Sequence, residues 1–172
     1  MSEASPKRVI IGWREWVSLP GLCDDPIKVK VDTGAATSAL HAFDLSVVQR
    51  DGEHYAEFEI HPAQRSRKNA IRVSVPIVGF RRIRSSSGHS ERRPVISAPI
   101  RIGARDFATE LTLTTRDEMG FRMLLGRAAL RRRYVVDASR SYVQGPYPDK
   151  KLRRSPPNRG SVGKSQKDRG TG

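Results

Sequence analysis

The chain has 172 residues, about the size of one domain, and 37% of them are apolar, enough to build a hydrophobic core. No run approaches the roughly 18 uninterrupted apolar residues of a membrane-spanning helix, and residues 1–7 lack the apolar core of a signal peptide. We therefore expect a cytoplasmic protein without a membrane partner. The 32 Lys and Arg residues outnumber the 18 Asp and Glu residues and give a formal net charge of +14, which favours nucleic acid, ribosomes or acidic peptides without choosing among them.

Short runs rich in Val, Ile, Phe and Thr, separated by Gly, Pro, Asp and Ser, predict a protein built almost entirely of β-strands. In the predicted strand over residues 27–31, apolar side chains (Ile27, Val29 and Val31) alternate with lysines. One face of that strand should therefore be apolar and the other exposed to solvent. One short helix is predicted over residues 127–132, after Gly126. The predicted strands are residues 8–17, 27–31, 39–48, 55–60, 70–75, 80–84, 94–102, 107–114, 123–125 and 134–136.

The chain divides into a flexible N-terminus over residues 1–7, one folded domain over residues 8–149 and a basic disordered tail over residues 150–172. The tail has eight basic residues and one acid among prolines and glycines, and it has too little apolar surface to fold. Its charge of +7 could anchor the protein to a ribosome or nucleic acid. Residues 160–165 resemble part of a phosphate loop, but Asn158 stands at the first glycine position and no strand precedes it, so we interpret the match as chance.

The alternating strand at residues 27–31 runs directly into Asp32-Thr33-Gly34. This order places a carboxylate on a turn. The glycine lets the backbone approach a neighbour or ligand, and the threonine hydroxyl can donate and accept hydrogen bonds nearby. The tripeptide alone is a weak signal, because an aspartate that caps an ordinary β-turn looks the same.

A second element, about ninety residues later, is Leu124-Leu125-Gly126 followed by the predicted helix. Together with Asp32-Thr33-Gly34 it resembles the aspartic peptidases of retroviral type, in which an apolar-apolar-Gly strand end supports the Asp-Thr-Gly loop. More closely, the chain resembles bacterial retropepsin-like peptidases associated with RimK-type glutamate ligases, a family formerly labelled ATP-dependent zinc proteases. The matching segments are residues 11–20, 31–35, 37–42, 93–96, 123–127 and 129–130.

The resemblance implies an all-β, pepsin-like or retropepsin-like barrel, closed or partly closed, with one short helix after Leu-Leu-Gly. It implies peptide hydrolysis by two aspartates that share a proton and activate a water, without a cofactor. Since the chain has one such aspartate, the enzyme would be a homodimer. The implied roles are catalysis by Asp32, support of its loop by Thr33, Gly34, Leu124, Leu125 and Gly126, and substrate binding by Ala35 and Ala36.

Two details of the resemblance are open. Retroviral relatives carry an acid at the position of Ala36, and this acid pairs with the arginine after the later glycine. Here Arg127 must find another partner or face solvent. The flap that covers the substrate could be the turn at Asp51-Gly52, which is a typical hairpin turn, or the loop over residues 65–69.

Arg81, Arg82 and Arg84 begin a basic stretch that continues to residue 93. It is either a solvated loop or an electropositive rim that binds an acidic substrate through charge-assisted hydrogen bonds. RimK-type ligases add glutamates to the C-terminus of a ribosomal protein, and the resemblance suggests that this peptidase family processes such tails. An acidic peptide or a glutamate-tagged ribosomal protein is therefore the expected substrate.

Other classes of function have weaker support. The four histidines have no metal-binding spacing and the chain's one cysteine gives them no cysteine cluster, so we expect no metal. His41 is expected to be a structural histidine near the active-site loop, and Cys23 a buried or loop thiol. The alternative to a peptidase is a non-catalytic binding module for a ribosome, nucleic acid or another acidic partner, which the charge favours. Against it, the aromatic residues form no paired platform for single-stranded nucleic acid.

Overall fold

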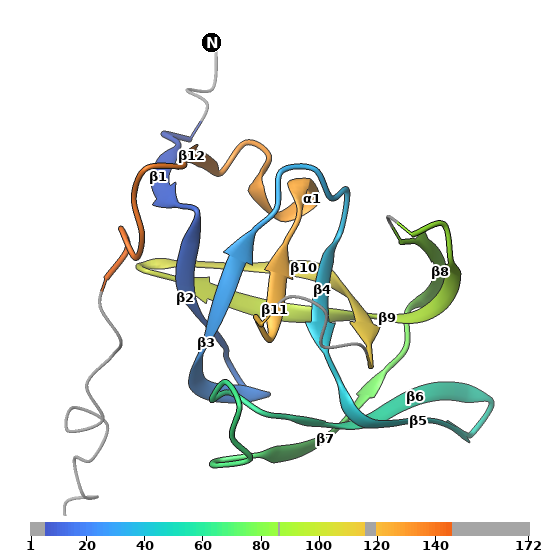
Figure 1. The fold of residues 1–172 in the computed structure, drawn as a ribbon. Coiled ribbons are helices and arrows are strands. Elements are labelled where there is room, and N and C mark those ends of the chain that lie inside the picture. Colours follow the sequence, from blue (N-terminus) through green and yellow to red (C-terminus); the bar gives the residue numbers. More distant parts are fainter. Residues whose placement is uncertain (1–5, 86, 116–119, 146–172) are drawn as a thin grey trace, which may run out of the picture.

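The computed structural model describes residues 6–85, 87–115 and 120–145, and most of the predicted N-terminal segment and all of the predicted tail lie outside them. Within these residues the chain forms strands and one helical turn (Figure 1). The elements are β1 (Val9–Gly12), β2 (Arg14–Leu19), β3 (Cys23–Val31), β4 (Ser38–His41), β5 (Phe43–Arg50), β6 (Glu53–Ile60), β7 (Ile71–Pro76), β8 (Gly79–Arg84), β9 (Ser90–Ile102), β10 (Arg105–Thr114), β11 (Met123–Leu125), α1 (Arg127–Leu130) and β12 (Tyr134–Asp137).

The largest sheet closes on itself. Its strand order is β10-β4-β11-β3-β2-β9-β8, and the antiparallel pairing of β10 with β9 closes the strands from β10 to β9 into a ring. The pairing within the ring is shortest between β2 and β9, whose register has the single pair Ser18 and Arg101. β8 lies outside the ring, paired with β9. The structure therefore confirms the predicted all-β class and the closed or partly closed barrel that the resemblance implies, here as a closed ring.

Two smaller sheets flank the barrel. β5, β6 and β7 form an antiparallel sheet, which lies at the lower end of the molecule in Figure 1. β1 pairs in parallel with β12, so the two ends of the described chain lie side by side.

One hydrophobic core fills the barrel and extends under the three-stranded sheet. The alternation seen in the sequence is its cause, because Ile27, Val29 and Val31 of β3 all point inward. Cys23, at the start of the same strand, is 1% exposed and packs as a small apolar residue. The largest fully buried side chains are Phe58, Ile11, Leu19, Ile27, Leu40, Ile60, Ile96, Ile100, Ile102, Leu111, Leu113 and Met123.

Two predicted strands are each divided in two. The segment 8–17 breaks at Trp13, whose amide donates to the Arg140 carbonyl at 3.0 Å, and there the chain passes from β1 to the barrel. The segment 39–48 breaks at Ala42, whose amide donates to the Thr114 carbonyl, and there the chain leaves the barrel for the three-stranded sheet. The predicted helix ends earlier than expected, at Leu130, because Arg131 and Arg132 leave helical geometry.

A buried carboxylate holds the end of the described chain to the barrel. Glu15 has no exposed surface, and its oxygens accept hydrogen bonds from the amides of Gly12 and Val143, both at 2.8 Å, and of Gln144 at 3.3 Å. Gly12 lies so close to this segment that a Cβ there would stand 2.3 Å from the Arg140 carbonyl oxygen. The two-residue period of a strand places Glu15 on the same face of β2 as the buried Val17 and Leu19.

In the part of the chain that the structure describes, we find no helix long and apolar enough to cross a membrane.

Candidate active site

Asp32 lies at one end of the barrel, in the loop that joins β3 to β4. Its amide donates to the Leu125 carbonyl at 2.9 Å, which ties the start of the loop to β11. Its carboxylate oxygen Oδ1 accepts hydrogen bonds from the amides of Gly34 at 3.0 Å and Ala35 at 3.2 Å. The side chain is half-buried, while Thr33 and Ala36 are exposed. The loop thus presents a fixed carboxylate at the surface.

β11 lies directly behind this loop, between the two strands that the loop connects. It pairs in parallel with β3 and antiparallel with β4, and Leu124 stands between Lys30 and Ala39. Leu125 is fully buried beneath the loop and Leu124 is half-buried. The structure therefore brings together two motifs that are about ninety residues apart in sequence.

Gly126 fits a space that no other residue could occupy. A Cβ at this position would lie 2.4 Å from the Thr37 carbonyl oxygen and 3.0 Å from that of Ala35. The Gly126 amide donates to the Ser38 hydroxyl at 3.0 Å. The next two amides, of Arg127 and Ala128, donate to the carbonyls of Ala35 and Ala36, so the first turn of α1 holds the loop.

Arg127 closes the other side of the loop. Its guanidinium donates to the carbonyl oxygens of Thr33 at 3.0 Å and Gly34 at 2.9 Å. Ala36 stands where retroviral relatives have an acid that pairs with this arginine. Here Arg127 donates to backbone carbonyls instead. The sequence could not identify these acceptors, because every residue has a backbone carbonyl and the residue type does not show which one accepts.

The predicted substrate-binding arginines do not share one face. Along β8 the side chains alternate, so Arg81 points opposite to Arg82 and Arg84, which are both exposed. Arg81 forms an ion pair with Glu110. Together with Thr37 from the active-site loop, these two side chains line an open pocket of about 500 Å³. Arg81 therefore lies beside the Asp32 loop. For all three predicted arginines to bind one substrate, that substrate would have to contact both faces of the β8–β9 hairpin.

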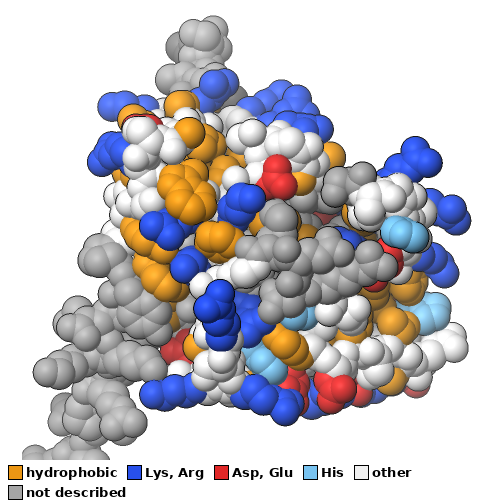
Figure 2. Space-filling model, viewed as in Figure 1, with side chains coloured by type: hydrophobic (Ala, Val, Ile, Leu, Met, Phe, Trp, Pro, Cys, Tyr) orange, Lys and Arg blue, Asp and Glu red, His pale blue; other side chains and the backbone are white. Residues whose placement is uncertain are grey.

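A second pocket, of about 440 Å³, lies on the other side of the loop, at Thr33. Four arginines contribute to its walls: Arg8, Arg127, Arg131 and Arg132. Sequence reasoning did not place Arg8, Arg131 or Arg132 beside the loop. Figure 2 likewise shows Lys and Arg side chains spread over the visible face, with few Asp and Glu side chains between them.

Neither segment considered for the flap lies near the active-site loop. In Figure 1 the turn between β5 and β6 and the loop between β6 and β7 both lie at the lower end of the molecule, whereas the β3–β4 loop is at the top. The hairpin of β8 and β9 instead curves upward on the side of that loop. This hairpin carries Arg81.

The histidines lie elsewhere. His41 is buried and its Nε2 lies 3.1 Å from the Thr115 carbonyl oxygen, which agrees with a structural role, but it stands at the end of β4 away from Asp32. Among the residues described, no three His, Cys, Asp or Glu side chains gather where they could hold a metal ion.

Comparison with known proteins gives three findings. The model of the RimB-like family, described as retropepsin-like aspartic endopeptidase RimB, matches residues 10–147. Proteins named "Probable alpha-L-glutamate ligase" are similar: that of Shewanella pealeana is 45% identical over 141 residues and that of Parasynechococcus marenigrum 46% over 139, or 82% and 81% of this chain. The matches span 31% and 30% of those relatives, less than a third of their length.

The fold is also similar to a solved structure. A Legionella pneumophila protein of unknown function superimposes with a TM-score of 0.65 at 23% identity, over 80% of this chain and 99% of that one. At this identity the likeness concerns the fold.

Proposed function

The chain belongs to the RimB-like family of retropepsin-like aspartic endopeptidases, and from this premise we propose that it hydrolyses peptide bonds with the Asp32 carboxylates of two copies. The observation that carries the proposal is the loop itself. Its carboxylate is at the surface of a barrel end, and β11, α1 and Arg127 fix the backbone around it. Such pre-organisation is what a catalytic group needs and what a simple turn does not.

The chemistry requires two carboxylates. Two like charges a few ångströms apart do not both ionise, so the pair holds one proton near working pH, and its pKa values belong to the pair. The ionised member takes a proton from the attacking water, while the protonated member donates a hydrogen bond to the scissile carbonyl. Because each chain contributes one Asp32, the two loops would meet at a two-fold axis, with Thr33 beside it.

The proposed substrate is an acidic peptide, such as a ribosomal protein tail that carries added glutamates. The similar proteins are named for glutamate ligation, and this chain has a net charge of +14. Ala35 and Ala36 would contact the substrate backbone. Arg81 would exchange its partner Glu110 for an acidic substrate side chain in the pocket beside Thr37. Arg82 and Arg84 would contribute only to the wider positive field.

A non-catalytic binding module is the second candidate, because the arginines around Thr33 could bind an anion without any reaction. The two functions differ in what they demand of Asp32. A binding module tolerates Asp32→Asn and loses affinity steeply with salt. A peptidase does not tolerate this change.

The dimeric mechanism can be tested by mixing subunits. Wild type would be incubated with increasing amounts of Asp32→Asn protein, and cleavage of a peptide ending in several glutamates would be followed by mass spectrometry. If the site is shared, inactive subunits enter mixed dimers and activity falls well below that of wild type diluted with buffer. Activity that depends only on the wild-type concentration would exclude a dyad formed across a dimer.

A further inference from the structure

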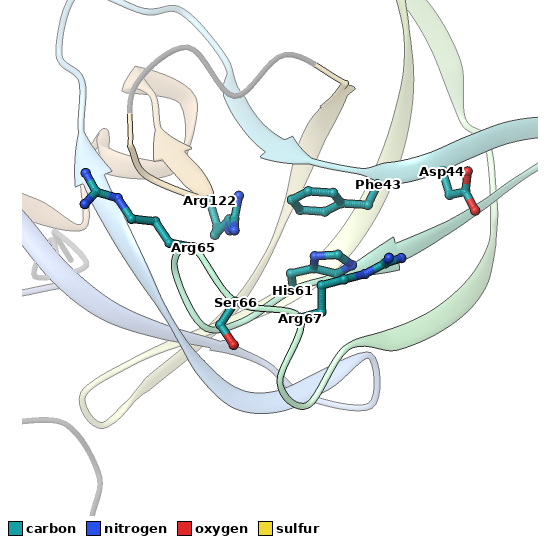
Figure 3. Close-up of a pocket in the computed structure, with 7 residues that line it drawn as sticks. All are labelled: Phe43, Asp44, His61, Arg65, Ser66, Arg67 and Arg122. Atoms are coloured by element: carbon teal, nitrogen blue, oxygen red, sulfur yellow. The ribbon is translucent and has the colours of Figure 1, made fainter.

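A third pocket, of about 490 Å³, lies around Phe43, at the end of β4 that is remote from Asp32 (Figure 3). Arg65 and Arg67 on its rim extend away from Arg122 in opposite directions, so the cations of this pocket do not form one binding site (Figure 3). A group of cations that does share one surface lies on the barrel, beside the candidate active site.

These three cations lie on the outer face of β2 and β3. Val29 and Val31 of β3 point into the core, so Lys28 and Lys30 point outward. In the register of the sheet, Arg14 of β2 stands directly opposite Lys30. Figure 2, in the same view as Figure 1, shows Lys and Arg side chains among apolar ones over these strands. Like charges that face each other on one side of a sheet are unfavourable, and an anionic ligand would relieve the repulsion.

Two of the three cations are held by aromatic rings. The guanidinium of Arg14 lies 4.6 Å from the ring centre of Trp13, and the ammonium of Lys28 lies 5.3 Å from that of Phe121. Lys30 is different. Within the residues that the structure describes, its half-buried side chain has no ion pair, hydrogen bond or ring contact. Lys30 is therefore the cation of this face that is available to a ligand.

Lys30 also lies close to the candidate catalytic carboxylate. The amide of Asp32 donates to the Leu125 carbonyl and so continues the ladder between β3 and β11. The side chains of Lys30 and Asp32, two positions apart, therefore lie on the same face, with Cα atoms about 6.6 Å apart. An extended peptide has the same rise per residue, so the ammonium can reach a substrate side chain one or two positions from the bond held at Asp32.

The surroundings of Lys30 favour an acidic peptide over RNA. The rings on this face are engaged within the protein: Trp16 and Tyr142 stack with centroids 5.3 Å apart, and Arg14 lies over both Tyr142 and Trp13. Binders of single-stranded nucleic acid instead offer ring faces to the bases. A carboxylate needs only the ammonium, and the half-buried Leu124, opposite Lys30 on β11, suits the methylene groups of a glutamate.

We propose that Lys30 is a specificity-determining residue that binds the carboxylate of a glutamate next to the scissile bond. The ammonium donates charge-assisted hydrogen bonds to that carboxylate. The inference rests on the proposed function, because Asp32 defines where the scissile bond lies. Since a dimer has two copies of Lys30, acidic residues on both sides of the bond are recognised, as in a run of consecutive glutamates.

The test is the substrate preference of Lys30 variants. Three peptides that differ only in their last residues, which are glutamates, glutamines or lysines, would be incubated with wild type, Lys30→Gln and Lys30→Glu, and cleavage would be followed by mass spectrometry. The matched control is Lys68→Glu, which makes the same change of charge in the exposed β6–β7 loop. Thermal unfolding would verify that each variant folds.

We expect wild type to prefer the glutamate peptide over the glutamine peptide by about tenfold or more in kcat/KM, as for one charged hydrogen bond. Lys30→Gln should lose this preference, and Lys30→Glu should favour the lysine peptide. A merely structural defect would lower all rates and keep the preference. An unchanged preference in the Lys30 variants, or the same change in Lys68→Glu, would overturn the inference.

A wild type that cleaves none of the peptides would contradict the proposed function, and binding would then decide the inference separately. The labelled glutamate peptide and a single-stranded oligoribonucleotide would be titrated by fluorescence anisotropy into Asp32→Asn protein with and without Lys30→Gln. A loss of about tenfold in affinity for the glutamate peptide would support recognition by Lys30. An unchanged affinity, or a loss confined to the oligoribonucleotide, would overturn it.

Discussion

Arg127 is a side chain that holds the loop carrying Asp32, the residue proposed to be catalytic. Its guanidinium reaches the carbonyls of Thr33 and Gly34, the two residues after Asp32. Arg127→Met should let the loop shift and lower kcat by about tenfold to a hundredfold, since small displacements of reacting groups are costly. Because Arg127 is exposed, the loss of stability should be small. Peptide cleavage and urea unfolding would be measured on the same preparation.

Arg127→Lys is the informative companion, because an ammonium keeps the charge but cannot reproduce the planar fork. It should recover only part of the activity. Arg101→Met, which alters an exposed arginine paired with Asp106, should cleave like wild type. Full activity of Arg127→Met would show that β11 and α1 hold the loop without this side chain.

Tyr134 combines burial with an unpaired hydroxyl. Its side chain is 7% exposed, and within the described residues its hydroxyl has no hydrogen-bond partner. Burial raises the pKa of Tyr134 above its usual value, an effect that Arg105 and Arg133 partly offset. The unfolded chain therefore ionises first, so stability is fully present below about pH 10 and is lost as the pH rises through the folded pKa.

Tyr134→Phe should therefore be neutral or stabilising by up to about 1 kcal/mol at pH 8, since it removes a buried group without a partner. Above about pH 10 the variant should lose less stability than wild type. Urea unfolding at the two pH values measures both effects. Equal losses of stability in the two proteins at high pH would mean that ionisation of Tyr134 does not cause the loss of stability there.

The residues of the site differ in how well sequence could predict them. Asp32 and Gly126 belong to recognisable patterns. In the structure Asp32 lies in the β3–β4 loop, and Gly126 lies against the backbone of that loop. The partners of Arg127 could not be predicted, because they are backbone carbonyls. The faces of Arg81 and Arg82 could have been separated by applying the two-residue period to the strand predicted over residues 80–84.

Among the elements, β2 depends on one buried acid. Glu15 accepts hydrogen bonds from three amides, two of them in the segment at Val143 and Gln144. Glu15→Ala would leave these amides without an acceptor and should lower the free energy of unfolding by about 3 kcal/mol or more. Urea unfolding would measure the loss. Glu53→Ala, which changes an exposed acid of β6, is the control and should differ from wild type by less than about 0.5 kcal/mol.

The strands were predictable wherever alternation was clear, as in β3, and their ends were not. β5 begins where Ala42 leaves the barrel, and nothing in a strand pattern says which sheet a strand joins. The helix was predicted two residues too long, because its end depends on Arg132 taking a positive φ of 64°. The pocket of Phe43 and Arg122 joins segments about eighty residues apart, so it too has no local signal.

At the scale of the whole molecule, the positive charge around Thr33 should affect the strength of dimerisation. Arg8, Arg127, Arg131 and Arg132 surround the residue proposed to lie at the two-fold axis. Two copies that meet there would bring like charges together, so dimerisation should strengthen as salt screens them. Sedimentation at low and moderate salt would give the dimer dissociation constant. Weaker dimerisation at higher salt would place the interface elsewhere or show that it is held by ion pairs.

The measurement that tests the central claim most directly is cleavage of a peptide that ends in several glutamates, by wild type and by Asp32→Asn. Mass spectrometry would identify the products from acid to neutral pH, after both proteins show the same dimer mass and thermal unfolding. We predict cleavage by wild type and none by the variant, because the dyad needs both carboxylates. Cleavage that survives in Asp32→Asn, or a dimeric wild type that cleaves nothing, would contradict the account.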